Sequence, residues 1–177
     1  PQPAYRMYES HPVVNSLILY HIGHGDVKVQ PDIARLDGRT VHFKDGSQKD
    51  YDMLMAATGY KLHYPFIDHA LLNWQGMAPR LYLNMLSPRF SRLAVLGMVE
   101  ASGLGWQGRY EQAELVARYF KGLDSGTPAA LALDQARQGP SPDVSGGYQY
   151  LQLERMAYYV NKDAYRAAVR QASAALA

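Results

Sequence analysis

The sequence predicts an α/β fold in which a β-meander is followed by two buried strands and a set of C-terminal helices. Three observations lead to this prediction: Asp-Gly turns that flank an alternating segment, two continuous apolar runs of strand length, and apolar residues at helical spacing in the C-terminal part. The chain has 177 residues, of which 47% are hydrophobic and 19% are charged. It is therefore long enough for one sizeable core.

The meander is predicted in the first third of the chain. Asp-Gly dipeptides, which tolerate positive φ, occur at 37–38 and 45–46, and residues 39–44 between them alternate in polarity. The segment 27–30 supplies further β-branched residues before Pro31. Because proline cannot donate a ladder hydrogen bond, this part is confined to a strand end, an edge or a bend.

The first buried strand is predicted at residues 51–60, YDMLMAATGY. This run is apolar without alternation and is bounded by polar turns, which is typical of a strand covered on both faces. A parallel position inside a sandwiched sheet is the expected location.

The second apolar run, 91–100, leads into a glycine-rich turn and then a helix at 109–123. Strand, glycine loop and helix together form an α/β unit. Gly122 is expected to end the helix. The residues at three- and four-residue spacing that predict its buried face are Ala113, Val116, Ala117 and Phe120.

The C-terminal part is predicted to be mostly helical. Thr127 and Pro128 are placed to start a short helix, since proline is favoured in the first helical turn. After the linker-like segment 140–147, residues 148–177 read as helix with a break near 161–163. Their tyrosines and leucines are expected to pack against the body of the protein.

Composition limits the function classes. The formal charge of +2 arises from mixed acidic and basic residues, which disfavours nucleic-acid binding. The absence of cysteine excludes disulfides and thiolate chemistry. No apolar run reaches membrane-spanning length and no signal peptide is recognisable, so we expect a cytoplasmic protein without a membrane partner. The start, Pro-Gln-Pro without Met, suggests a piece of a longer polypeptide.

Residues 103–108, GLGWQG, have the G-x-G-x-x-G spacing of dinucleotide-binding loops. Such a loop would bind pyrophosphate at a helix N-terminus. However, three residues, Glu100, Ala101 and Ser102, separate the expected strand end from the first glycine. No β-branched strand follows the helix to deliver an acidic residue to a ribose. A structural glycine loop is the simpler interpretation, and an independent pyrophosphate site is the alternative.

The histidines do not define a site. His21 and His24, with Asp26, have metal-compatible spacing, but the neighbouring glycines favour a surface turn and no third ligand is fixed nearby. His63 and His69 could serve as acid or base groups, although nothing places a partner beside either. No serine lies in a nucleophile-elbow pattern. The sequence thus assigns neither a metal site nor a catalytic residue.

Taken in order, several motifs resemble the C-terminal half of the flavin-containing monooxygenases, bacterial members above all. The strongest is A-T-G-Y at 57–60 after an apolar strand. The resemblance covers most of the chain, and its other pieces are HPVVNS, D-V-x-V-x-P-x-I-x-x-L-D-G, V-x-F-x-D-G, YPF, LYLNML, LAVLGMVE, EQAELVARYF and AYYVNKDAY.

The resemblance implies a fragment of an FAD/NAD(P)-binding fold. By this reading residues 1–60 close an NADPH-binding domain that contains the meander, 61–139 form the returning part of an FAD-binding domain, and 140–177 form a C-terminal helical tail. The residues expected to bind the cofactors are Ala57, Thr58, Gly59, Tyr60, Met98, Val99 and Glu100. The alternative at 57–60 is a Thr-Gly turn that only ends a buried strand.

Glycine at position 59 would allow the backbone to approach a ligand closely, and Thr58 would hold the turn by a local hydrogen bond. Near Met98, the N-terminus of the following helix would point toward the flavin ring, where its dipole favours negative charge. The alternative here is a packed strand end.

Both nucleotide fingerprints of the family, for FAD and for NADPH, are missing before 51–60. We therefore expect the C-terminal portion of an FAD- and NADPH-dependent monooxygenase that inserts one oxygen from O2 into a small organic substrate and is inactive alone. The expected partner is an N-terminal half or a second copy that pairs through exposed sheet edges. A non-catalytic interaction domain and a shortened nucleotide-binding module that uses GLGWQG are the alternatives.

Overall fold

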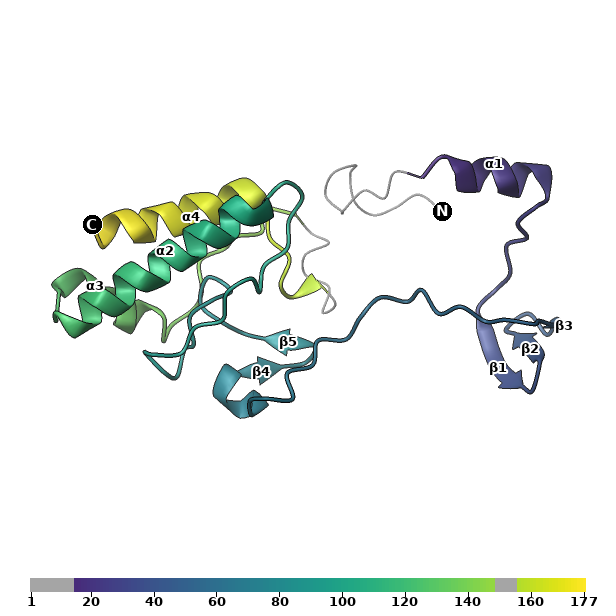
Figure 1. Ribbon diagram of the computed structural model, residues 1–177, viewed down its shortest axis with the longest axis horizontal. Coiled ribbons are helices and arrows are strands. Elements are labelled where there is room, and N and C mark those ends of the chain that lie inside the picture. Colours follow the sequence, from purple (N-terminus) through teal and green to yellow (C-terminus); the bar gives the residue numbers. More distant parts are fainter. Residues whose placement is uncertain (1–14, 149–155) are drawn as a thin grey trace. The chain divides into compact units, whose positions relative to one another are not determined.

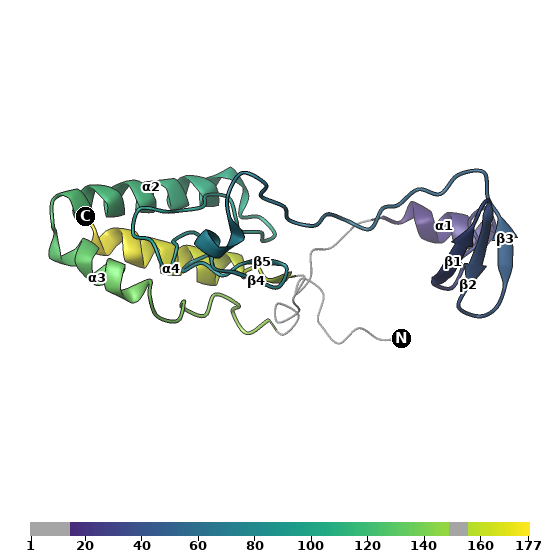
Figure 2. The ribbon, with the colours of Figure 1, turned by 90° about the horizontal axis from the view of Figure 1, so that it is seen from below.

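The computed structural model describes residues 15–148 and 156–177 of the chain. These residues belong to two units, 15–60 and 61–177, and the chain passes from one to the other after Tyr60 (Figures 1 and 2). Both helices and strands are present, so the mixed α/β class is confirmed.

The unit 15–60 contains the predicted meander. Strands β1 (Ile33–Asp37), β2 (Thr40–Phe43) and β3 (Gln48–Asp50) form an antiparallel sheet in the order β1-β2-β3. Along β2 the side chains alternate between half-buried and buried, with Val41 and Phe43 buried. The alternating pattern therefore predicted this sheet correctly, as period-two patterning should for a sheet with one covered face.

Two features of this unit differ from the sequence prediction. The sheet begins only at Ile33, after Pro31, so the valines at 27 and 29 lie outside it and are exposed. Upstream, residues Leu17–His24 form helix α1, which ends at Gly25 in a left-handed conformation. A glycine C-cap of this kind terminates many helices.

The buried strand predicted at 51–60 is wrong. Only Tyr51 continues the sheet, where its N–H donates to the Arg39 carbonyl at 2.9 Å, and no strand includes the rest of the segment. Met53, Leu54 and Met55 are exposed. A strand buried on both faces needs a neighbour to pair with and layers to cover it, and the described residues supply neither. An apolar pattern alone therefore does not make this segment a strand.

The unit 61–177 is organised around three helices: α2 (Gly105–Asp124), α3 (Pro128–Ala136) and α4 (Lys162–Ala175). Helix α4 lies alongside α2, and α3 packs against the C-terminal part of α2 (Figures 1 and 2). The N-terminal segment of this unit carries a short 3₁₀ helix, His69–Leu72, and a small hairpin of β4 (Trp74–Gln75) and β5 (Ala78–Pro79).

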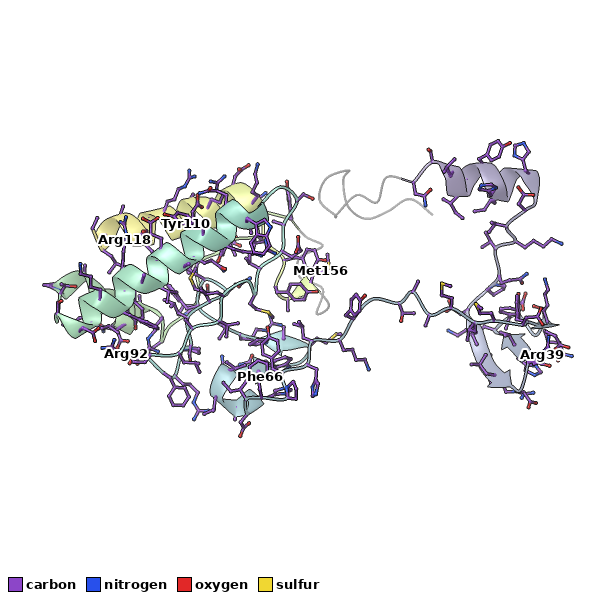
Figure 3. The ribbon with its side chains drawn as sticks, viewed as in Figure 1. Arg39, Phe66, Arg92, Tyr110, Arg118 and Met156 are labelled. Carbon is purple, nitrogen blue, oxygen red and sulfur yellow. The ribbon has the colours of Figure 1, made fainter. Side chains whose placement is uncertain are left out.

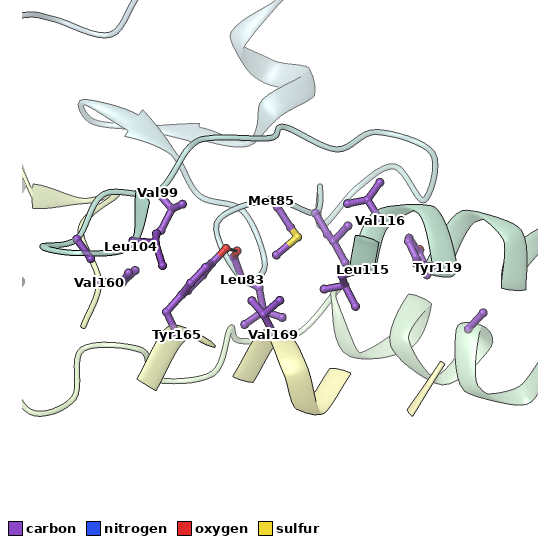
Figure 4. Packing of buried hydrophobic residues seen from close by; sticks show 13 residues of the cluster. Leu83, Met85, Val99, Leu104, Leu115, Val116, Tyr119, Val160, Tyr165 and Val169 are labelled. Carbon is purple, nitrogen blue, oxygen red and sulfur yellow. Dashed lines mark hydrogen bonds between the residues drawn. The ribbon is translucent and has the colours of Figure 1, made fainter. Parts of the chain in front are cut away.

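The core of this unit lies between α2, α4 and the loop 81–101 that crosses them. Figure 4 shows this cluster, with the Tyr165 ring of α4 beside Val169 and the loop residues Leu83 and Met85. The buried members of the cluster are Leu83, Met85, Leu86, Val99, Ala101, Leu104, Leu115, Val116, Tyr119, Ala130, Val160, Tyr165 and Val169.

The second predicted strand, 91–100, is also absent as a continuous element. The segment forms single bridges, from Ala94 to Leu86 and from Glu100 to Tyr159. Gly97 lies between them at φ +85°, which bends the chain, and its N–H donates to the side chain of Gln112 instead of to a neighbouring strand. A turn of this kind interrupts the hydrogen-bond ladder of a strand. Met98 and Val99, near the end of the segment, are nevertheless buried.

Helix α2 is confirmed, but its buried face is shifted from the predicted one. Of the four predicted residues only Val116 is buried. The face turned to the core includes Glu111 and Gln112, which hydropathy alone assigns to solvent because it does not reveal their buried partners. The buried residues of α2 are Gly108, Glu111, Gln112, Leu115, Val116 and Tyr119.

Gly122 does not end α2, which continues to Asp124. A Cβ at Gly122 would lie 2.7 Å from the Ala130 Cβ and 2.9 Å from the Thr127 Oγ1. Glycine is therefore required here because α3 approaches α2 closely.

The two C-terminal helix starts agree with the prediction. Thr127 caps α3 and Pro128 is its first residue, and Asn161 caps α4 by accepting the N–H groups of Asp163 and Ala164. The break predicted at 161–163 is confirmed. Residues 149–155, where helix was also expected, lie outside the described residues. Within the described residues no helix is long and apolar enough to cross a membrane.

Candidate functional site

A shallow hollow lies at the N-terminal end of α2, beside the turn at 96–97. Its volume is about 580 Å³. The first turn of α2 carries no acidic residue, and its N-cap, Leu104, makes no side-chain capping bond. The positive end of the helix dipole therefore remains available to an electron-rich group. The residues that line the hollow are Leu96, Gly97, Trp106, Arg109 and Tyr110.

Arg109 sets the charge of this hollow. Its guanidinium carbon lies 5.7 Å from the centroid of the Trp106 ring, and Nη1 donates to the Gly105 carbonyl at 2.8 Å. Its Nη2 lies 3.8 Å from Oε2 of Glu100, at the edge of ion-pair distance. Trp106 is 86% exposed. Tyr110 projects from α2 (Figure 3) and lines the same hollow. Exposed rings next to a cation suit a flat ligand that carries partial negative charge.

The structure brings Met98, Val99 and Glu100 together just before α2, but with different exposures. Met98 and Val99 are 5% and 1% exposed and belong to the core, and the Met98 sulfur accepts the Tyr64 hydroxyl at 3.5 Å. Their side chains are therefore committed to packing. Glu100 is half-buried, so it alone of the three presents a side chain toward solvent, although its N–H is paired with the Tyr158 carbonyl.

Residues 57–60 belong to the other unit, 15–60. Ala57, Thr58, Gly59 and Tyr60 are all exposed, and Gly59 has φ +82° with no atom within 4 Å of where a Cβ would lie. The conformation at Gly59 is one that side-chain-bearing residues rarely adopt, so glycine suits this position. The segment is thus exposed and irregular in this structure, without the buried strand predicted in front of it.

A buried chain of hydrogen bonds supports the rim of the hollow. The Gly97 N–H donates to Oε1 of Gln112 at 2.9 Å, and Nε2 of Gln112 donates to the Tyr165 hydroxyl at 2.6 Å. The Tyr165 hydroxyl donates in turn to the Leu83 carbonyl at 2.9 Å. Burial raises the pKa of Tyr165, which keeps this hydroxyl neutral as a donor.

The GLGWQG segment has a packing role in the structure. Leu104 is buried in the core, and a Cβ at Gly108 would lie 2.4 Å from Cγ of Leu104. No strand leads directly into this segment in the described chain, so the structural context of a dinucleotide fingerprint is absent there. The glycines start α2 and admit Leu104 beneath it.

The histidines are placed differently from the sequence prediction. His21 and His24 lie in α1 and not in a turn, where His21 Nδ1 is 3.1 Å from Asp26 Oδ2 and His24 Nδ1 is 2.9 Å from the Tyr20 carbonyl oxygen. His69 stacks on Trp74 with ring centroids 4.0 Å apart. Among the described residues no group of three metal-binding side chains is present.

Two clusters of charged side chains, each with one residue that is almost buried, join the helices around the site. Glu111 of α2 accepts bonds from Arg166 and Arg170 of α4, and mainly the hydrogen bond from Arg166 lowers the pKa of Glu111 to about 2. Tyr119 is buried with Asp134 and Arg137, and burial raises its pKa to about 12. Every partner in these clusters is occupied, so we assign both to stability.

Sequence reasoning missed Trp106, Arg109, Gln112 and Tyr165. A signal existed for the first two: Trp106, Arg109 and Tyr110 are spaced to share the exposed side of a helix that starts after glycines. No signal in one sequence could pair Gln112 with Gly97, since their contact depends on the bend at 97.

The comparisons with known proteins cover most of the chain. The family model for flavin-binding monooxygenase-like proteins matches residues 2–152. Dimethylaniline monooxygenase (N-oxide-forming) 2 of Rattus norvegicus is 31% identical over 126 residues, which are 70% of this chain and 23% of that protein. 4-Hydroxybenzoate brominase (decarboxylating) of Marinomonas mediterranea is 31% identical over 115 residues, 63% of this chain and 21% of that protein.

Flavin-containing monooxygenase 2 of Homo sapiens is 30% identical over 128 residues, 71% of this chain and 24% of that protein. No solved structure matches the chain. The chain spans about a quarter of the length of these monooxygenase relatives. The family match includes both 57–60 and 98–100, the segments singled out from the sequence. The chain belongs to the flavin-binding monooxygenase-like family.

Proposed function

We propose that this chain forms part of an FAD- and NADPH-dependent monooxygenase that inserts one oxygen atom from O2 into a small organic substrate. The observation that carries the proposal is the family match over residues 2–152, which includes 57–60 and the approach to α2. The fold we propose for the complete protein is accordingly an FAD/NAD(P)-binding fold. FAD supplies the redox and oxygen-transfer chemistry when bound, and NADPH supplies the electrons.

The residues at the start of α2 fit a flavin ring. The open helix N-terminus and Arg109 favour negative charge, and Trp106 and Tyr110 offer ring surfaces at the same hollow. Backbone groups, rather than the packed side chains of Met98 and Val99, would face the ring there. Gly59 would allow close approach of the backbone at the second segment.

We further propose that the chain alone does not turn over substrate. The segment 51–60 has no covering layer among the described residues, and neither nucleotide fingerprint of the family precedes it in this sequence. A polypeptide that supplies partner strands for this segment and the nucleotide fingerprints would provide both missing features.

The test is a chimera in which residues of this chain replace the matched 126-residue segment of the rat relative. We expect the purified chimera to show flavin absorbance bands and to oxidise NADPH. Replacing Gly59 by Val should lower the flavin content several-fold, because Val is strained at φ +82°. Gly46→Val is the matched control, since Gly46 also has positive φ and open space around it but lies in the hairpin turn.

A chimera that unfolds cooperatively but carries no flavin would contradict the proposal. Equal loss of flavin in the two glycine variants would remove the assignment of 57–60 as a cofactor segment. A non-catalytic interaction domain is the second candidate, and the exposed apolar side chains Met53, Leu54 and Met55 favour it.

A further inference from the structure

The buried chain of hydrogen bonds from Gly97 to Leu83 joins three parts of the fold. Gly97 lies in the rim of the hollow, Gln112 in α2, and Tyr165 in α4. Gln112 and Tyr165 are fully buried, and Gln112 is a polar residue in the middle of an apolar core. A buried amide is retained only where its donors and acceptor find partners.

The two ends of this chain determine its direction. The Gly97 N–H can only donate and the Leu83 carbonyl can only accept. Oε1 of Gln112 must therefore face Gly97, and its Nε2 must face Tyr165, whose hydroxyl donates to the Leu83 carbonyl. If the amide were rotated by half a turn, two donors would face each other at Gly97, and the Leu83 carbonyl would lose its partner to the amide oxygen.

We infer that Gln112 is a positioning residue that holds the Leu96–Gly97 turn at the hollow, and that Tyr165 fixes the orientation of its amide. That this turn contacts a flavin rests on the proposed function. The hydrogen bonds themselves are observed in the structure. Gly97 depends on this support because its φ of +85° removes it from any strand ladder. The Gln112 side chain replaces the missing ladder partner.

The far end of the chain is anchored at an unusual backbone. Leu83 and Asn84 have φ values of 50° and 54°, a conformation that non-glycine residues adopt only where their surroundings enforce it. The Leu83 N–H is held by the Ser141 hydroxyl at 3.0 Å and its carbonyl by Tyr165. The packing of α4 is thereby linked to the geometry of the hollow, although no residue of α4 lines the hollow.

The test is residue-resolved amide hydrogen exchange by NMR on this chain without cofactor. Relative to the parent chain, Gln112→Leu should accelerate exchange at Gly97 about tenfold, and Tyr165→Phe about threefold, beyond any change common to the amides of α2. Gln112→Glu keeps an oxygen for the Gly97 N–H and should restore protection to within about threefold of the parent chain.

The matched control is Tyr119→Phe. Tyr119 is also buried, and its hydroxyl also bonds to two partners, but these are Asp134 and Arg137. The Tyr119→Phe variant should lower overall stability without selectively accelerating amide exchange at Gly97. The proposal is overturned if Gly97 exchange follows the global change in every variant, or if Tyr119→Phe accelerates it as much as Tyr165→Phe. If Gln112→Leu does not fold, the two tyrosine variants decide.

In the flavin-bearing chimera, Gln112→Leu should weaken flavin binding at least threefold, and Tyr119→Phe should not. Unchanged flavin affinity in Gln112→Leu would remove the functional part of this inference. A chimera without flavin contradicts the proposed function and leaves the exchange result to decide on the positioning role, because that experiment contains no cofactor.

Discussion

The strongest prediction about stability concerns Glu111, through which α2 and α4 are joined by charge. Arg166 donates to its carboxylate through Nε at 3.1 Å and Nη2 at 2.6 Å, and Arg170 donates through Nη2 at 2.9 Å. The Glu111 side chain is only 10% exposed. Glu111→Gln keeps the size of the side chain but removes the charge, so both arginines lose a charge-assisted partner.

The magnitude follows from the pKa of Glu111, which falls from an ordinary 4.5 to about 2, mainly because Arg166 hydrogen bonds to the carboxylate. Each pKa unit corresponds to 1.36 kcal/mol, so the full shift would represent about 3 kcal/mol. Arg170 is 61% exposed, and water screens part of the interaction. We therefore expect Glu111→Gln to lower the free energy of unfolding by about 1–2 kcal/mol at neutral pH.

The sign of the pH dependence follows directly. The carboxyl group has a lower pKa in the folded state than in the unfolded state, so its stabilisation is complete above pH 4.5 and is lost as the pH falls toward 2. Urea unfolding of both proteins at several pH values measures the difference. That difference should shrink across this window.

Glu114→Gln is the matched control, because Glu114 lies on the same helix and pairs with Arg118 at 2.7 Å but is 39% exposed. It should cost less than about 0.5 kcal/mol. Equal unfolding free energies for the parent chain and Glu111→Gln at neutral pH would refute the reasoning. So would a difference between them that stays constant from neutral pH down to pH 2.

Three further predictions address the core, a helix cap and the exposed segment. Leu115→Ala should lower the free energy of unfolding by about 2–5 kcal/mol, since Leu115 is fully buried in the core cluster, and urea unfolding measures this. Asn161→Ala should cost about 1 kcal/mol because it removes the cap of α4, and unchanged thermal stability would contradict that role. Met53→Asp with Met55→Asp should reduce self-association of this chain measured by sedimentation velocity, because exposed apolar side chains drive association. Concentration-independent sedimentation of the parent chain would argue against a homo-oligomer formed through this segment.

Sequence pattern predicted those elements whose determinants are local. The hairpin between β1 and β2 was recognisable because Asp37 and Gly38 set the turn, and because alternation along 40–43 identifies the covered face. The starts of α3 and α4 were recognisable from capping residues. In each case the residues that determine the element lie within a few positions of it.

The sequence pattern gave wrong predictions where the residues that determine an element lie far away in the sequence. The apolar run at 51–60 carries the composition of a covered strand, but strand formation depends on neighbours that the described residues do not include. The face of α2 was misplaced for a related reason. Glu111 and Gln112 are buried only because Arg166 and Tyr165, more than 50 positions away, supply partners.

The candidate site divides in the same way. Gly59 could be singled out from the sequence since the A-T-G-Y motif is local, and its role toward a cofactor stays a prediction. Trp106 was missed because α2 begins at Gly105, earlier than predicted, which left Trp106 outside the predicted helix. Arg109 lay inside the predicted helix, but its neighbour on the exposed face did not. Gln112 required the bend at 97 to be known.

The two segments proposed to contact a cofactor therefore differ in what each would need for that role. The turn at 96–97 is already held by Gln112 within the unit 61–177, with every partner in the described chain. The segment 57–60 is exposed and lacks strand partners there, so its geometry near a ligand depends on contacts that form elsewhere. A substitution at Gln112 should consequently be detectable in this chain alone, whereas one at Gly59 should be detectable only in an assembled flavoprotein. Because stability of the isolated chain reports on the first and flavin content on the second, the two measurements test the two proposed segments independently.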